Sequence, residues 1–262
     1  MGNWGEEEWQ KAHADGYKDT VFSITPDQGV RDRTIQEIKH TLTEIPAGMP
    51  RILLPACGTA GILERDIAKR ISPQPQILCT DFQSVADLAR ARNTNAAIIY
   101  EGRDSRDLGL NAAVDAVVVM NSVVAPEKAD NDRMLKSFHK ALVPGGALIG
   151  LFPTIFCALD VSLTIKNPDI GKAISGCIEL EQGMIVDTAH DARQAFYTPL
   201  QLRAALLEAG FMPQDIKMDI LFMDSPYFQA ETTRLYGLQP EDPPIYELFI
   251  TARKRSTPQP AP

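Results

Sequence analysis

The residues best placed to do chemistry lie in two short segments, each at the end of a run of apolar residues. The first segment, LLPACGTAGIL, contains Gly58, which would let the backbone approach a ligand closely. The helix expected to begin near Gly61 would point its free N–H groups toward that ligand. The second segment, ILCTD, ends in Asp81, 23 positions after Gly58. An acid at roughly this offset, about 20 residues, binds ribose hydroxyls in α/β folds, so the spacing indicates a nucleoside site.

Each segment also has an ordinary structural explanation. The glycine loop could be a tight turn between a strand and a helix, because one essential glycine is weaker evidence than a full G-x-G-x-x-G pattern. Asp81 could cap a helix that starts near Ser84. The combination of the two segments favours the nucleoside site over either explanation alone.

These loops must be positioned by a parallel sheet, because short apolar runs alternate with amphipathic helical stretches. A helix from Asn131 to Leu142, with Leu135 and Phe138 on one face, is expected to stop at Pro144-Gly145-Gly146. The expected strands, in chain order, are residues 51–54, 76–79, 97–100, 114–120, 147–152, 215–223 and 246–252.

The pattern is interrupted between Pro153 and Ala195, which we interpret as a lid. Regularity returns with a helix over 200–209, which Thr198 and Pro199 begin and Gly210 ends. An amphipathic helix is expected over 30–45, and the polar, proline-rich tail is not expected to pack.

Between positions 51 and 254 the sequence resembles the class I S-adenosylmethionine-dependent methyltransferases, whose motifs occur here in the family's order. PACGTAG is similar to the glycine-rich first motif, CTDF to the second, and EGRDSRDLGL to the segment that meets the adenine. VDAVVVMNSVVAPE, ALVPGGALIGLF and FYTPLQLRAALLEAGF are similar to the following three motifs.

The resemblance implies a Rossmann-like, doubly wound α/β fold with a seven-stranded, mostly parallel sheet and an antiparallel last strand. It implies N-terminal helices over 1–48, a methyltransferase domain over 49–254 with a lid insertion at 153–195, and a disordered tail over 255–262. It also implies S-adenosylmethionine as the cofactor. The residues expected to contact this cofactor are Tyr17, Ala56, Gly58, Thr59, Asp81, Phe82, Asp104, Ser105 and Asn121.

The sequence departs from the family pattern at two positions of the loop. The family usually has an acid two residues before the first glycine of its loop. Leu54 occupies that position here, with Pro55 beside it, and Ala60 replaces a common glycine. The acid normally helps to hold the cofactor's amino group, so its loss predicts a weaker or differently anchored cofactor.

No catalytic base is evident, because Val123 and Val124 stand where the family often has a histidine. The candidates are His13, Tyr17 and His190, although the helical spacing of His13 and Tyr17 is also typical of a packed aromatic stripe. Methyl transfer from a sulfonium needs no metal, and the four separated cysteines show no zinc-ligand spacing.

The composition restricts the partners. The chain has 26 basic and 34 acidic residues, a net charge of −8, without a basic cluster, which disfavours nucleic acid. No run approaches the roughly 18 apolar residues of a membrane span, and no secretory signal is evident, so we expect a cytoplasmic monomer or homodimer. Aromatic residues in or beside the interrupted stretch and the segment 224–244 favour a small, largely apolar, natural-product-like acceptor, although they are equally typical of a second core under the lid. They include Phe152, Phe156, Tyr197, Phe222 and Tyr227.

Three other functions remain open from the sequence. A cyclase or pericyclic catalyst could use the sulfonium as a fixed cation, and a binding subunit could keep the fold without catalysis. A dinucleotide-dependent oxidoreductase would share the ribose acid, but the loop lacks the second and third glycines of the pyrophosphate fingerprint.

Overall fold

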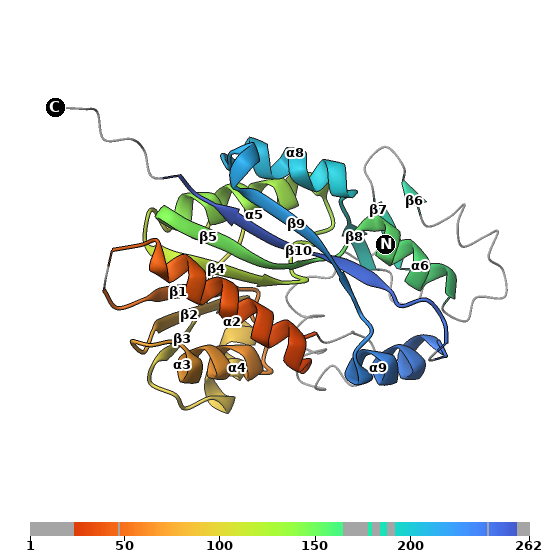
Figure 1. Ribbon diagram of the computed structural model, residues 1–262, viewed down its shortest axis with the longest axis horizontal. Helices are drawn as coiled ribbons and strands as arrows, with labels where there is room; N and C mark the ends of the chain where they lie inside the picture. Colours follow the sequence, from red (N-terminus) through yellow and green to blue (C-terminus); the bar gives the residue numbers. More distant parts are fainter. Residues whose placement is uncertain are drawn as a thin grey trace.

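The computed structural model describes residues 24–46, 48–164, 178–179, 184–187, 192–239 and 241–255. A seven-stranded sheet forms the centre of the fold, with strand order β3-β2-β1-β4-β5-β10-β9 (Figure 1). Its strands are β1 (Arg51–Pro55), β2 (Gln76–Asp81), β3 (Ile98–Gly102), β4 (Val114–Met120), β5 (Leu142–Phe152), β9 (Ile216–Phe222) and β10 (Tyr246–Arg253).

Strand directions match the fold that the sequence predicted. The pairs β1–β2, β2–β3, β1–β4 and β4–β5 are all parallel. Only β10 runs the other way, because it pairs antiparallel with both β5 and β9. The predicted Rossmann-like sheet with an antiparallel last strand is therefore confirmed.

Helices cover both faces of this sheet, as a doubly wound fold requires. The helices are α2 (Gln28–Thr43), α3 (Ile62–Arg70), α4 (Gln83–Arg92), α5 (Lys128–Ala141), α6 (Ile155–Thr164), α8 (Pro199–Ala209) and α9 (Pro226–Tyr236). One buried cluster joins α2, α3 and α4 to the sheet, and a second cluster joins α5 and α8 to the opposite face.

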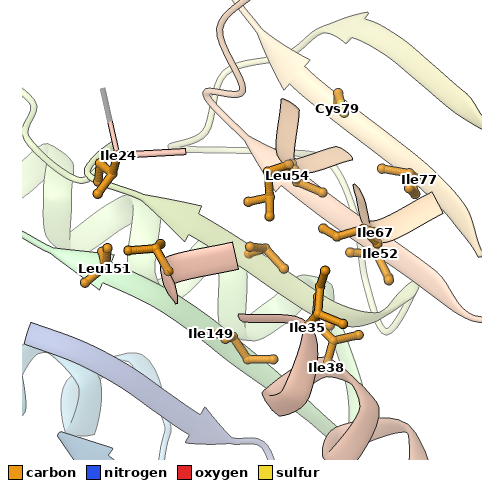
Figure 2. Close-up of a cluster of buried hydrophobic side chains, with 14 of the residues drawn as sticks. Ile24, Ile35, Ile38, Ile52, Leu54, Ile67, Ile77, Cys79, Ile149 and Leu151 are labelled. Carbon is orange, nitrogen blue, oxygen red and sulfur yellow. The ribbon is translucent and has the colours of Figure 1, made fainter. Parts of the chain in front are cut away.

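The two clusters follow from the alternation of side chains along each strand. Ile52 and Leu54 of β1 point into the first cluster, whereas Leu53 between them points into the second. Figure 2 shows Ile35 and Ile38 of α2 directed at the sheet beside Ile52 and Ile149. Burial on both faces explains why β1 and β4 read as continuous apolar runs.

The helix predicted over 200–209 is confirmed, together with the residues that begin and end it. Thr198 accepts a hydrogen bond from the backbone of Gln201, whose side chain accepts one from the Thr198 backbone, and Pro199 occupies the first turn. Gly210 ends the helix with a φ of 114°.

The prediction for the helix before β5 was wrong at its carboxyl end. The helix stops at Ala141, and Leu142 already belongs to β5. Pro144-Gly145-Gly146 therefore lies inside a strand and does not end the helix. Leu142 pairs with Val114 of β4 and Ala147 with Ala116, so these residues lie in the irregularity between the two pairings. The backbones of Gly145 and Gly146 instead bond Lys254, just after β10.

The stretch from 153 to 195, where the sequence pattern is interrupted, contains a helix and three short strands within its described residues. Besides α6, it carries a three-stranded antiparallel sheet of β6 (Ile178–Glu179), β7 (Met184–Asp187) and β8 (Ala192–Ala195). Asn131 ties this unit to the main domain, because its side chain bonds the backbones of Ala125 and Ala195. The irregular sequence pattern reflects very short strands, which carry too few residues to show a period.

Candidate functional site

The strand order predicts a ligand crevice between β1 and β4. The chain proceeds from β1 outward to β3, then returns to β4 on the other side of β1. In open α/β sheets, ligands bind at the carboxyl ends of the strands where the order reverses in this way. The loops that follow β1, β2, β3 and β4 all lie at this edge, and they carry the predicted cofactor residues from Ala56 to Asn121.

Asp81 fixes the shape of the glycine loop. Its carboxylate accepts a hydrogen bond from the Gly58 N–H at 2.9 Å and another from the Phe82 N–H at 2.8 Å. The side chain does not cap the following helix, whose N-cap residue is Phe82. Ala56 and Gly58 both adopt left-handed conformations, with φ values of 47° and 63°. Glycine adopts this conformation readily, but alanine does not, so the loop needs support at Ala56. Asp81 and Gly58 thus lie at the same edge of the sheet, and the structure adds a direct bond between them.

Thr59 also belongs to this loop. It is buried, and Arg92 at the end of α4 donates a hydrogen bond to its hydroxyl oxygen at 2.9 Å. The loop is therefore held from the side of α4 as well as by Asp81.

The next two loops present an exposed ring and a bound carboxylate. Phe82, directly after β2, exposes 42% of its surface, which is a high value for an apolar aromatic residue. Asp104 after β3 forms an ion pair with Arg106, whose guanidinium also reaches Asp130. Hydrogen bonds from Arg106 hold the pKa of Asp104 below its ordinary value. Ser105 between them is partly buried.

The position of the missing loop acid is closed to polar ligands. Leu54 is only 4% exposed and lies in the cluster under α2 and α3. A buried carboxyl does lie behind the loop, on α3, where Glu64 accepts a hydrogen bond from the Tyr100 hydroxyl at 3.3 Å. Burial raises the pKa of Glu64. Leu54 therefore serves the core and leaves no carboxylate at the end of β1.

Asn121 lies at the end of β4 in a left-handed conformation, with a φ of 50°. Asparagine tolerates this region better than most residues. Its side-chain nitrogen donates a 2.6 Å hydrogen bond to Glu247, the second residue of β10. The backbone N–H of Asn121 donates to Leu151 of β5, the strand that lies between β4 and β10. The amide of Asn121 thus extends past β5 to reach a carboxylate on the next strand.

Glu247 is a functional candidate that the sequence reasoning missed. It is 3% exposed, and burial raises its pKa to about 7 although the hydrogen bond from Asn121 acts in the opposite direction. One signal could have identified it: Glu247 is the single acid in YELFITAR, a strand whose other residues are mainly apolar. Buried carboxyl groups with raised pKa values at the ligand edge of a fold are typical of functional sites.

Several predicted residues cannot be placed at this site. His13, Tyr17 and His190 lie outside the described residues. Two aromatic residues considered for the acceptor pocket, Phe152 and Tyr197, belong instead to the core beneath α5 and α8. Within the described ranges, no three acidic, histidine or cysteine side chains are grouped closely enough to hold a metal ion.

None of the described helices combines the length and the apolar character that crossing a bilayer requires.

The fold is similar to that of solved methyltransferases. An S-adenosylmethionine-dependent methyltransferase from Mesorhizobium loti gives a TM-score of 0.54 at 17% identity, covering 85% of this chain and all (100%) of that one. Another from Methanosarcina mazei gives 0.56 at 14% identity, covering 82% and 96%. Phosphoethanolamine N-methyltransferase 2 of Haemonchus contortus, solved with S-adenosyl-L-methionine, gives 0.54 at 14% identity, covering 84% and 53%.

No protein-family model matches the sequence, and no curated protein matches it. At the identities of the solved structures, the similarity establishes architecture and not activity. Strand order, strand directions and the edge loops nevertheless agree with what the sequence motifs predicted. The chain has the fold of the class I S-adenosylmethionine-dependent methyltransferases.

Proposed function

We propose that this protein binds S-adenosylmethionine at the crevice between β1 and β4 and transfers its methyl group to a small, largely apolar acceptor. The observation that supports the proposal is the bond between Asp81 and the Gly58 N–H, which joins the acid expected to bind ribose to the glycine loop at the switch point of the sheet. S-adenosylmethionine supplies an activated methyl group on a positively charged sulfur.

The residues at the crevice fit this cofactor by chemical type. The Asp81 carboxylate lies beside the glycine loop at the ligand edge of the sheet, and a carboxylate is the type of acceptor that binds ribose hydroxyls in α/β folds. The exposed Phe82 ring offers a stacking surface to the adenine. Because Leu54 provides no carboxylate, the cofactor's amino group must be held by other groups of the loop.

Two properties support a small apolar acceptor. Phe156 on α6 and Phe222 at the end of β9 expose 44% and 52% of their surfaces near the ligand edge of the sheet. Exposed aromatic groups of this kind favour an apolar partner. The net charge of −8 opposes phosphate-rich acceptors such as nucleic acid.

Calorimetric titration with S-adenosylmethionine and S-adenosylhomocysteine tests the cofactor. We expect the wild type to bind both. Replacing Phe82 with alanine should weaken both about tenfold, because stacking between a base and an aromatic ring contributes about 1–3 kcal/mol. The control is Met212→Ala, which removes a side chain of nearly the same exposure, 43%, beyond the end of α8.

The outcomes separate the candidate functions. Absence of binding to the wild type would refute the cofactor assignment and leave a binding subunit as the interpretation. Binding without release of S-adenosylhomocysteine during turnover would point to the cyclase. Equal loss in the Phe82 and Met212 variants would remove the adenine-stacking role of Phe82.

A further inference from the structure

The polar atoms around Asn121 and Glu247 lack partners although they are buried. They are the Asn121 Oδ1, the Glu247 Oε2 and the hydroxyl of Ser122, none of which has a hydrogen-bond partner within the described structure. Buried polar atoms are almost always paired, so a group of orphaned ones requires an explanation. All three atoms belong to residues where β4 ends and β10 begins, at the ligand edge of the sheet.

These atoms define the ligand that would satisfy them. The Asn121 amide already directs its N–H donor at Glu247 Oε1, so its remaining oxygen can only accept. An ionised Glu247 can also only accept, whereas the Ser122 hydroxyl can donate one hydrogen bond. A ligand that brings donors satisfies the remaining acceptors. An amine with two or three N–H groups can reach several of them at once, whereas a phenol or an alcohol brings a single O–H.

The surrounding charges leave the Glu247 carboxylate uncompensated. On α6, burial raises the pKa of the Cys157 thiol, and the negative charges of Glu247 and Asp160 raise it further. On α2, the Arg33 guanidinium stacks on Phe249 two residues away. It forms its ion pair with Asp219 and not with Glu247.

No basic side chain of the described residues therefore pairs with Glu247. A buried carboxylate without a cation is costly, and a cationic ligand would offset that cost.

We propose that Glu247, oriented by Asn121, receives the nitrogen of an amine acceptor and removes its proton. This inference rests on the proposed function, and it identifies the acceptor class as amines. In the step, one N–H bond of the ammonium group breaks, an O–H bond forms at Glu247 Oε2, and the electron pair stays on nitrogen. Methyl transfer to nitrogen requires that free pair, because a protonated amine is not a nucleophile.

The test measures the binding of candidate acceptors. Wild-type protein saturated with S-adenosylhomocysteine is titrated with benzylamine, benzyl alcohol, hexylamine, hexanol and p-cresol. We expect at least one amine to bind tenfold or more tightly than the alcohol of the same skeleton. The amine should also bind more tightly than p-cresol. Glu247→Gln should abolish this preference while S-adenosylhomocysteine affinity stays within about twofold.

Glu64→Gln is the matched control, because Glu64 is also 3% exposed and has a raised pKa but lies behind the glycine loop. It should keep the amine preference. The inference is overturned if no amine exceeds its alcohol, if p-cresol binds best, or if the Glu247 variant keeps the preference. Failure of S-adenosylhomocysteine itself to bind would instead overturn the proposed function.

Discussion

Replacing Glu247 with glutamine should make the protein more stable at alkaline pH and alter how its stability depends on pH. Burial raises the pKa of Glu247 from 4.5 to about 7. Between these two values the folded state holds a proton that the unfolded state has released, so stability falls as pH rises through this window. Because one pKa unit corresponds to about 1.4 kcal/mol, ionisation at alkaline pH costs the native state about 3 kcal/mol.

The glutamine variant cannot ionise, and it keeps an acceptor oxygen for the Asn121 amide. Urea unfolding of both proteins at about pH 5 and about pH 8 provides the comparison. The stability of the variant relative to wild type should increase by about 2 to 3 kcal/mol between the two pH values. Taking this difference cancels the other titrating groups, including the buried Glu64, whose pKa is also raised.

One result would refute the reasoning. If the stabilities of the two proteins change in parallel with pH, Glu247 has an ordinary pKa and is hydrated in the native state. The orphaned oxygens would then be satisfied by water, and the argument for an amine ligand would lose its basis.

Three further substitutions test the site and its supports. Asp81→Asn replaces one accepting oxygen with an N–H donor and breaks the bond to Gly58. It should lower the free energy of unfolding by about 1–3 kcal/mol in urea titrations. Gly150→Ala would place its Cβ 1.8 Å from the backbone oxygen of the neighbouring strand. It should lower the free energy of unfolding by more than about 3 kcal/mol, whereas Gly48→Ala meets nothing closer than 4.0 Å and should be nearly neutral. Thr198→Ala removes the N-cap of α8 and should cost about 1 kcal/mol, measured as a shift in thermal midpoint.

Each substitution has an outcome that contradicts its reasoning. An unchanged unfolding midpoint for the Asp81 variant would mean that the glycine loop keeps its shape without the carboxylate. A Gly150 variant as stable as the Gly48 variant would mean that β4 and β5 are not packed as described. A neutral Thr198 variant would show that Pro199 and Gln201 define the start of α8 without the hydroxyl.

The sequence alone determined the features that depend on neighbours along the chain. Alternating strands and helices predicted the parallel sheet, and the limits of α8 followed from Thr198, Pro199 and Gly210, each of which acts within one helical turn. The spacing of Gly58 and Asp81 indicated that both loops face one nucleoside site, because successive parallel strands present their carboxyl ends at one edge.

Only the tertiary structure brought Glu247 to Asn121, a residue 126 positions earlier in the chain. Their contact depends on β10 entering the sheet antiparallel beside β5, which no local pattern specifies. Backbone bonds from Gly145 and Gly146 to the distant Lys254 likewise make Pro144-Gly145-Gly146 part of a strand in place of a turn. Sheet hydrogen bonds and burial are long-range terms, so they decide a position wherever the local signal is weak or points to another structure.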